Sequence, residues 1–497
     1  MSLQSPTLLD VLRVNAQLHG SRLAFRIGEQ CVTHAQYLQR IRRLANGLAA
    51  AGVQPTDRIA LLAPNNLDPV DLLGAAAYLG AILVPINTRL SADEVSFIVA
   101  DVSPCMLFVA SELQALVSSA ATAVTQVHTL GTDGGLQALH RDGDTPPAEA
   151  PARAPLVIIH TAAVAGRPRG AMLSHAGLLA AGKQHQLLWQ ITPDDVHLGA
   201  LPLYHVGGLG LLLATQIAGG TTLLMPKFDP QAVVRHSDHD GGSVIGTFPP
   251  MLDALLEAAA AQGSQLKNLR VVSGIDSSEN IARLRAMCPR ATFWSVYGQT
   301  ETSGPVSLCA FDEKPGSAGR PTLLNRVAVV DDLDRCTPPG VVGEIVVQGP
   351  SVFLGYWRCD EDNARTGRNG WHHTGDLGRI DADGYLWYEG RSPAKELIKP
   401  GGENVYPDEV ERVIAEHPAV QLVAVLGVSD PQWGEAVKAV CVLKAGRLLA
   451  ASELIEFVGS RIARYKKPRH VVFVESLPLT ADGALDRAAL KAAHGHA

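Results

Sequence analysis

Short apolar segments alternate with segments of helical pattern through the first part of the chain, and this order restricts the fold more than any other feature. Residues 58–64, 82–85 and 106–110 are apolar and read as buried strands, while residues 71–79 and 92–100 between them show helical patterns. Strands that alternate with helices form βαβ units, in which the strands lie parallel. The sequence therefore predicts an α/β fold with mostly parallel sheets.

The length of the chain requires more than one domain. Single hydrophobic cores stop growing near about 250–300 residues, and this chain has 497. A stretch rich in Pro, Asp and Ala at residues 140–155 reads as an exposed loop or linker, and a strand follows it at residues 156–161. A second series of strands is expected at residues 221–225, 243–246, 268–273 and 292–297.

The pattern changes twice in the second half. After Pro339, short strands joined by turns predict a small β subdomain. Beyond Arg391 the pattern is again α/β, and we place a domain boundary between Arg391 and Lys395. The strands of the subdomain are expected at residues 344–348, 377–381 and 384–389; the later helices at residues 407–417 and 451–464; and the later strands at residues 420–428 and 437–443.

Composition limits the location and the partners of the chain. Hydrophobic residues are 46% and charged residues 18%, which excludes general disorder. The net charge of -7 argues against a nucleic-acid or anionic-membrane binder. No apolar run reaches about 18 residues and the start lacks a secretory signal pattern, so no membrane span or export is expected. Seven widely spaced cysteines without a CxxC pair fit reduced thiols in a cytoplasmic protein rather than disulfides or a zinc site.

Residues 160–175 (HTAAVAGRPRGAMLSH) form the first segment that suggests chemistry. A Gly-x-Pro-x-Gly turn follows an apolar strand and leads into a helical pattern, and such a connection can present backbone N–H groups to phosphate. It lacks the Gly-Lys-Ser/Thr ending of a Walker P-loop. Taken alone, the segment favours a plain surface turn.

A second segment, residues 295–304 (SVYGQTETSG), gathers polar groups after a strand. Glu301 is suited to Mg²⁺, which prefers carboxylate and phosphate oxygens. Thr300 and Tyr297 are suited to meet a phosphate or a base. The alternative is a polar strand exit, which is common.

The third and fourth segments are residues 370–376 (GWHHTGD) and 390–411 (GRSPAKELIKPGGENVYPDEVE). We expect a Thr-Gly turn before Asp376, and the aspartate after this turn is suited to accept both hydroxyl groups of a ribose. His372 and His373 do not predict a metal site, because adjacent residues of a strand point to opposite faces. The fourth segment crosses the proposed boundary, and a Gly-Gly turn precedes its helix.

These segments, in this order and at these separations, are far more specific together than singly. The chain resembles, essentially from end to end, the adenylate-forming superfamily of acyl-CoA synthetases, luciferases and peptide-synthetase adenylation domains. Further matches are LPLYHVGG at residues 201–208, GEIVVQGPSVFLGYW at 343–357 and DPQWGEAVKAVCVL at 430–443. Length and ending are closest to the acyl-CoA synthetases.

The resemblance implies a particular arrangement of domains. A large N-terminal domain of stacked α/β sheets would comprise residues 1–391 and include a β subdomain at residues 340–391. A small mobile C-terminal α/β lid domain would comprise residues 395–497. The lid would turn on a hinge near Lys395, with the active site at the interface.

The resemblance also implies roles for single residues. Glu301 resembles the Mg²⁺-site glutamate and Thr300 the phosphate-contacting threonine; Asp376 resembles the ribose-binding aspartate, and Arg391 the arginine that meets ribose or phosphate. His205 falls where the family gates the acyl pocket. The remaining nucleotide and coenzyme A positions are Thr161, Gly166, Arg169 and Gly170 in the phosphate loop, Tyr297, Gly298 and Gln299 after the strand, and Gly401, Gly402 and Trp433 in the lid.

The implied activity is that of an ATP-dependent acid–CoA ligase. A carboxylate attacks the α-phosphate of ATP, pyrophosphate leaves, and the thiol of coenzyme A then attacks the acyl-adenylate. ATP, Mg²⁺ and coenzyme A are the expected cofactors, and the substrate is a small-molecule carboxylic acid that the sequence does not identify. The oligomeric state also stays open, a homodimer being one alternative.

Two departures from the family pattern motivate an alternative. The phosphate loop has lost its Ser and Thr hydroxyls between Ala162 and Ala165, and Arg169 replaces a lysine. Ala484 stands where the family has a lysine that contacts the substrate carboxylate and the α-phosphate, although Lys466 or Lys467 can be considered as substitutes. The alternative is a catalytically impaired homologue that binds nucleotide or acyl-CoA, or one that retains only the acyl-transfer half-reaction.

Overall fold

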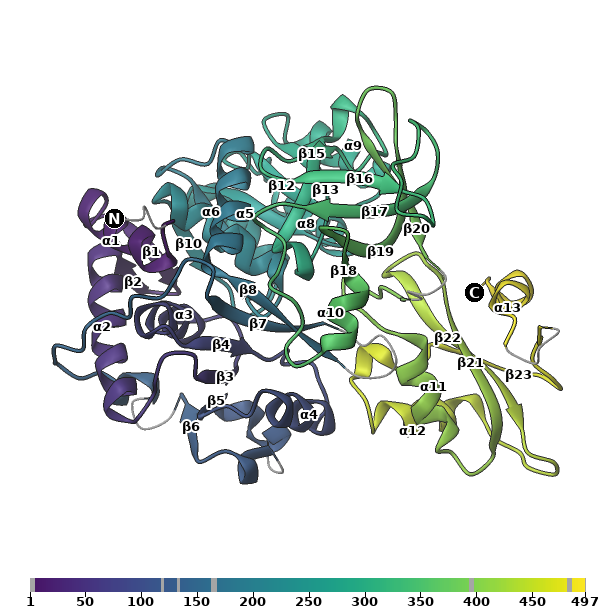
Figure 1. Ribbon diagram of the computed structural model, residues 1–497. Helices are drawn as coiled ribbons and strands as arrows, with labels where there is room; N and C mark the ends of the chain where they lie inside the picture. The colour runs from purple at the N-terminus through teal and green to yellow at the C-terminus, as the bar shows by residue number, and fades with distance from the viewer. Residues whose placement is uncertain are drawn as a thin grey trace.

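The computed structural model describes residues 5–117, 120–131, 135–161, 168–392, 397–480 and 485–496. Two large sheets with their helices form most of the molecule, a smaller β unit lies beside them, and a separate α/β unit lies at the C-terminal end (Figure 1). The expected α/β class, with a large first part built of sheets and a small C-terminal part, is confirmed.

The first large sheet has the strand order β6-β5-β3-β4-β7-β8, and only β8 runs antiparallel to its neighbour. Helices α2 and α3 cover one face and α4 the other. Strands buried on both faces carry apolar residues at successive positions, and for this reason the sequence predicted strands of this sheet. The bounds are β3 (Arg58–Leu62), β4 (Ile82–Pro85), β5 (Met106–Ala110), β6 (Gln126–Leu130), β7 (Pro155–Thr161), β8 (Arg169–Ser174), α2 (His34–Ala50), α3 (Leu67–Leu79) and α4 (Ala92–Val102).

The second large sheet has the order β15-β14-β13-β12-β11-β9-β10-β1-β2. Val244 and Ile245 are neighbours in β11 but pack into different cores, Val244 on the side of α5 and α6 and Ile245 on the side of α7, α8 and α9. The strands are β1 (Leu23–Ile27), β2 (Gln30–Thr33), β9 (Val196–Gly199), β10 (Thr221–Leu224), β11 (Gly242–Thr247), β12 (Val271–Gly274), β13 (Thr292–Gln299), β14 (Gly304–Ala310) and β15 (Arg320–Pro321). The helices are α5 (His175–Leu188), α6 (Val206–Ala218), α7 (Pro230–His239), α8 (Met251–Gln262) and α9 (Ser278–Met287).

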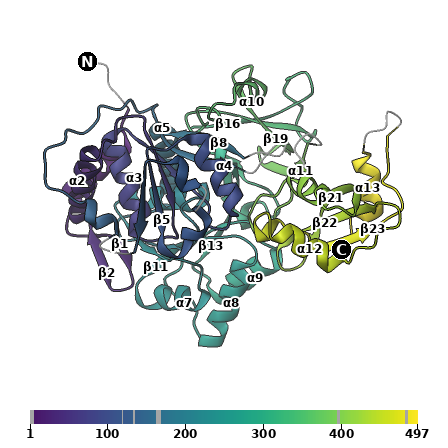
Figure 2. The ribbon, with the colours of Figure 1, turned by 90° about the horizontal axis from the view of Figure 1, so that it is seen from below.

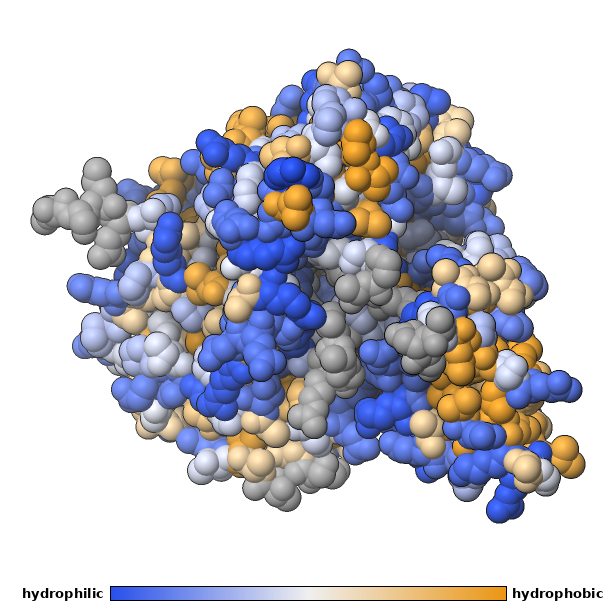
Figure 3. Space-filling model, turned by 45° about the vertical axis from the view of Figure 1, so that its right-hand side comes forward, coloured by the Kyte–Doolittle hydropathy of each residue, from blue (hydrophilic) through white to orange (hydrophobic). Residues whose placement is uncertain are grey.

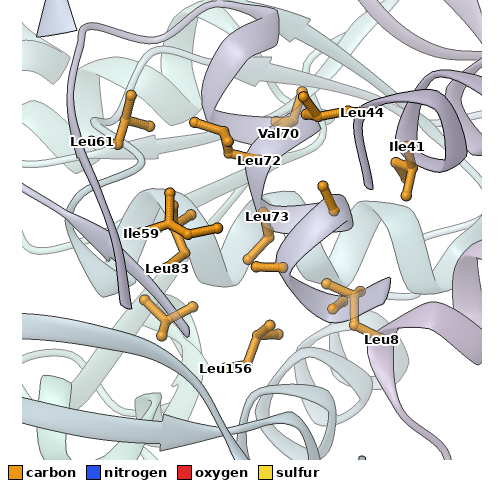
Figure 4. Close-up of a cluster of buried hydrophobic side chains, with 14 of the residues drawn as sticks. Leu8, Ile41, Leu44, Ile59, Leu61, Val70, Leu72, Leu73, Leu83 and Leu156 are labelled. Carbon is orange, nitrogen blue, oxygen red and sulfur yellow. The ribbon is translucent and has the colours of Figure 1, made fainter. Parts of the chain in front are cut away.

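One hydrophobic cluster joins the two large sheets. Leu8 of α1 (Leu8–Leu18), Ile41 and Leu72 pack there with Leu178 of α5 and Leu212 of α6. Figure 4 shows part of this cluster, in which side chains from the helices and from β3, β4 and β7 point toward one another. Full burial of each such side chain contributes about 1.5–3 kcal/mol, so the two sheets are held together as one body.

The smaller β unit and the C-terminal unit lie next to each other (Figures 1 and 2). In the β unit, β19 pairs with β17, β18 and β20; in the C-terminal unit, β21 and β22 form a long antiparallel pair and β23 lies parallel to β22. The bounds are β16 (Arg326–Val330), β17 (Gly343–Gln348), α10 (Asp360–Thr366), β18 (Gly367–Arg368), β19 (Trp371–Ile380), β20 (Leu386–Arg391), α11 (Pro407–Ala415), β21 (Val420–Asp430), β22 (Gly434–Leu443), α12 (Ala451–Gly459), β23 (His470–Phe473) and α13 (Arg487–His494).

The face seen in Figure 3 is mostly polar. Figure 3 shows polar side chains over most of the large part and a group of apolar side chains on the C-terminal unit at the lower right. Exposed apolar residues of that unit include Leu422, Leu448 and Leu479. Within the described residues, none of the helices has the length and apolar character needed to cross a bilayer.

Candidate active site

A single cavity of about 1160 Å³ lies where the second large sheet, the β unit and the C-terminal unit meet. It exceeds the roughly 300–1,000 Å³ typical of pockets for one small ligand. Its walls include the ends of β12 and β13, and in parallel α/β sheets ligands bind beyond the carboxyl ends of strands. Among the residues named from the sequence, those that line it are Thr161, His205, Tyr297, Gly298, Gln299, Thr300, Glu301, Asp376, Arg391, Gly401, Gly402 and Trp433.

Asp376 is held by two donors from β13. The hydroxyl of Tyr297 donates to its Oδ2 at 2.9 Å, and Nε2 of Gln299 donates to the same oxygen at 2.6 Å. The Asp376 residue is 6% exposed. Burial and the nearby Asp376 charge raise the pKa of Tyr297 well above its usual value, so the phenol stays a donor. A carboxylate accepts several hydrogen bonds, and this one is therefore fixed in a position suited to ligand hydroxyl groups.

Glu301 lies in the short 3-10 turn that follows β13 and is 8% exposed. The hydroxyl of Tyr356 donates to its Oε1 at 2.7 Å. Mg²⁺ is usually held by one or two carboxylates together with substrate phosphates and water. No group of three or more His, Cys, Asp or Glu side chains that could hold a metal occurs among the described residues. Glu301 therefore fits an ion that arrives with a nucleotide better than a resident metal in a protein cage.

Arg169 is placed differently from the other predicted phosphate-loop residues. Its guanidinium lies 4.1 Å from the centroid of the Tyr356 ring and forms a 3.0 Å ion pair with Asp362 of α10. It is not among the described residues that line the cavity. Gly170 follows it in β8, and a Cβ there would come within 2.7 Å of Ile158. The structure thus connects Arg169 to Glu301 through the Tyr356 ring, while Gly166, Lys395 and Ala484 lie outside the described residues.

Each of the paired histidines contacts a neighbouring side chain. His372 and His373 are adjacent in β19, where Nε2 of His372 lies 3.4 Å from Oε1 of Gln299 and Nδ1 of His373 lies 2.8 Å from Glu344. The prediction of a turn before Asp376 needs correction. Although Gly375 has a φ of +70°, residues 371–380 form one continuous strand, because β17 and β20 both pair with it.

Arg391 connects the β unit to the C-terminal unit. It lies opposite Asp376 in the β19–β20 ladder. Its guanidinium donates to the carbonyl of Leu397 and lies 3.9 Å from the Glu435 carboxylate. Arg391 is therefore close both to the carboxylate at the end of the cavity and to the segment that leads into the C-terminal unit.

Two glycines let the C-terminal unit approach the cavity closely. Gly401 and Gly402 have φ values of +59° and +84°, which other residues rarely adopt. A Cβ on Gly401 would come within 2.7 Å of the Trp433 ring, and one on Gly402 would lie 3.5 Å from Phe248. This turn brings the backbone of the C-terminal unit against the loop after β11.

Glu403, next in the chain, was not singled out from the sequence. It is 5% exposed and accepts hydrogen bonds from Asn87 (3.1 Å) and Arg89 (3.0 Å), and Nε2 of His205 lies 3.3 Å away. Burial would raise the pKa of Glu403, but His205, Arg89 and Asn87 outweigh it and lower the pKa. A charged carboxylate thus joins the C-terminal unit to His205.

Lys466 makes a second charged contact between the C-terminal unit and the large part. Its Nζ forms ion pairs with Glu94 of α4 and with Glu409 of α11, the latter at 2.7 Å. Burial would lower the pKa of Lys466, but both carboxylates outweigh it and raise the pKa. In this arrangement Lys466 is occupied by two carboxylates, and Lys467 is not among the described residues that line the cavity.

Comparison with known proteins agrees with this fold. Residues 12–357 match the family described as AMP-binding enzyme, and residues 409–484 match the AMP-binding enzyme C-terminal domain. The chain belongs to the AMP-binding enzyme family, which confirms the resemblance found in the sequence.

Individual relatives of this chain include a CoA ligase and a CoA synthetase. The chain is 35% identical over 483 residues to an indoleacetate–CoA ligase of Aromatoleum aromaticum, with 94% of each chain covered. It is similar to a double mutant of o-succinylbenzoate CoA synthetase from Bacillus subtilis, bound with the product analogue OSB-NCoA (TM-score 0.88, 29% identity, 98% of each chain). ATP-bound MatB from Rhodopseudomonas palustris matches with a TM-score of 0.72 at 29% identity, covering 98% of this chain and 99% of MatB.

Proposed function

We propose that this protein is an ATP-dependent acid–CoA ligase that works through an acyl-adenylate. The observation that supports this most is the single cavity that unites the oriented carboxylate of Asp376, the buried Glu301, and Gly401, Gly402 and Trp433 of the C-terminal unit. A cavity of this size suits a nucleotide, an acid and the end of coenzyme A together. The named relatives are CoA ligases and synthetases, which points to the same reaction.

In the first step the acid carboxylate would attack the α-phosphate of ATP and displace pyrophosphate. Asp376 would bind the ribose hydroxyls, and Thr300 and Arg391 would meet phosphate or ribose oxygens. Mg²⁺, when held by Glu301, would supply neutralisation of the phosphate charge. Thr161 and Gly166 would belong to the phosphate loop, Arg169 and Gly170 would support its end from the start of β8, and Tyr297, Gly298 and Gln299 would form the nucleotide wall. Positioning of the reactants and electrostatic stabilisation of the transition state would provide most of the rate acceleration.

In the second step the thiol of coenzyme A would attack the acyl carbonyl and release AMP. We infer that the C-terminal unit, residues 395–497, turns on a hinge near Lys395 relative to residues 1–391. Solved relatives of 29% identity match this chain with TM-scores of 0.88 for the one bound with a CoA product analogue, and of 0.71 and 0.72 for apo and ATP-bound MatB. A different placement of one domain would produce such a difference. The contacts of Glu403 and Lys466 would then belong to the thioester step.

The experiment that tests the proposal separates the two steps. Pyrophosphate exchange into ATP, with a panel of carboxylic acids, reports adenylation, and thioester formation with coenzyme A reports the whole reaction. Acid-dependent exchange together with an acyl-CoA product is expected. Absence of exchange, with a preformed acyl-adenylate still converted to thioester, would support the acyl-transfer alternative. Absence of both would overturn the proposal.

A further inference from the structure

Gly210 leaves an opening in a buried wall of the cavity. It lies in α6, is buried, and lines the cavity together with Gly207 and Leu211. These positions share one face of the helix, because residues three and four apart lie together. A Cβ added at Gly210 would meet nothing within 4 Å. A buried position with no neighbour at this distance faces a void, so α6 leaves room there for part of a ligand.

Helix α5 supplies an aromatic wall to the same cavity. The rings of His185 and Trp189 are stacked, with centroids 4.9 Å apart and an interplanar angle of 22°. Nε2 of His185 lies 3.2 Å from the carbonyl oxygen of Pro305 in β14, which fixes the ring. Burial lowers the pKa of His185 to about 4, so the ring is neutral at neutral pH.

The cavity residues contributed by α5, α6 and β14 carry no charge at neutral pH. The described cavity residues contributed by α5, α6 and β14 are His185, Val206, Gly207, Gly208, Gly210, Leu211, Gly304 and Pro305, with Trp189 directly after α5. Trp189 and Leu211 also belong to an apolar cluster that includes Val296 and Phe248 at its edge. A charged group placed against these three elements would lose its hydration without gaining a charged partner from them, which disfavours a charged substrate end here.

We propose that the acid substrate carries an uncharged aromatic ring, which lies between α5 and α6 in the space beside Gly210. This inference rests on the proposed function and names the substrate class of the same site. A flat ring can stack against the His185–Trp189 pair, and aromatic pairs are stabilised beyond the effect of the area they bury. An alkyl chain of equal carbon number gains no stacking and loses more rotational freedom on binding.

The test compares phenylacetate with octanoate, which have the same number of carbon atoms, and with propionate and succinate. In the wild type, kcat/KM for acyl-CoA formation should be at least tenfold higher for phenylacetate than for octanoate or succinate. Gly210→Leu would fill the opening and should lower kcat/KM at least tenfold for phenylacetate and less than threefold for propionate. Gly210→Ala, which favours the helix, should lower kcat/KM for phenylacetate less than Gly210→Leu does.

Binding measurements keep this inference separate from the ligase activity. Calorimetry with the non-reactive phenylacetyl and octanoyl sulfamoyl-adenosine analogues should give at least tenfold tighter binding for the aromatic analogue, and Gly210→Leu should remove the preference. Equal or better binding and turnover of the octanoyl compounds would overturn the inference, as would an equal loss for all acids in Gly210→Leu. Selective binding of the aromatic analogue without any acyl-CoA product would sustain the inference and overturn the proposed function.

Discussion

At the scale of single residues, Asp376 shows how two neighbours fix a binding group. Tyr297 and Gln299 donate to one of its oxygens, so its position does not depend on a ligand. Asp376→Asn removes the charge and leaves one carbonyl oxygen for both donors. We expect at least tenfold weaker binding of ATP and AMP, or about 1.4 kcal/mol, by calorimetry. Asp383→Asn, in the exposed turn between β19 and β20, is the matched control; equal affinity in both variants would remove Asp376 from the nucleotide site.

A second residue-scale prediction concerns Ala484. Lys466 pairs with Glu94 and Glu409 in the arrangement that we assign to the thioester step, and position 484 itself offers no lysine for adenylation. Ala484→Lys should therefore raise the rate of pyrophosphate exchange at least tenfold, since one preorganised donor near developing charge contributes roughly 10²–10³ in rate. Ala488→Lys adds the same charge at an exposed position of α13 and should have little effect. Rapid exchange in the wild type that Ala484→Lys does not increase would contradict this prediction.

At the scale of elements, α4 of the large part holds the C-terminal unit through its first turn. Glu94 accepts the backbone N–H of Ala463 at 3.1 Å and pairs with Lys466. Glu94→Gln keeps the shape but removes one of the two charges facing a buried ammonium, which destabilises this position of the unit. We expect thioester formation from a preformed acyl-adenylate to slow about tenfold, or about 1.4 kcal/mol, and pyrophosphate exchange to change less than twofold.

The control for this contact is Asp93→Asn, which changes an exposed carboxylate in the same helical turn. It should leave both steps near the wild-type rates. Glu94 also accepts the backbone N–H of Ser91 at the start of α4 (2.7 Å), so a general loss of stability is a competing explanation. Equal slowing of both steps, together with a lower melting temperature, would show that Glu94 acts through the helix start and not through the C-terminal unit.

Elements buried on both faces could be predicted from the sequence, and contacts between distant elements could not. β4 and β5 lie where they were expected, because their apolar runs are bounded by helical patterns. β19 begins at Trp371 rather than at residue 377, since most of its first residues are polar and depend on pairing with β17 and β18. Tyr297 and Asp376 were named because each lies in a recognisable segment. The Glu94–Lys466 pair joins residues 372 positions apart, and no local sequence pattern predicts such a contact.

At the scale of the whole molecule, several histidines are buried in the large part. Burial lowers the pKa of His175 and His185 to about 4 and that of His197 to about 3. The unfolded chain, with a histidine pKa near 6.5, binds more protons below that pH than the folded chain does. Each buried histidine therefore stabilises the fold fully above about pH 6.5, and this contribution is lost as the pH falls toward its folded pKa. Asp71 has the opposite effect on the pH dependence of stability. Burial raises its pKa to about 6, so its contribution to the fold is lost as the pH rises toward that value.

The difference in pH dependence between the wild type and a His197 variant isolates the contribution of one buried histidine. His197 is 1% exposed, and its Nε2 has no hydrogen-bond partner among the described residues. His197→Met removes the titrating group and keeps an apolar side chain between the strands. Between pH 7.5 and pH 5, the free energy of unfolding of the wild type should fall by about 2 kcal/mol relative to His197→Met, measured from urea denaturation. The exposed His239→Met is the control and should follow the wild type. If both variants show the pH dependence of the wild type, the buried ring of His197 does not account for the acid sensitivity of the large part.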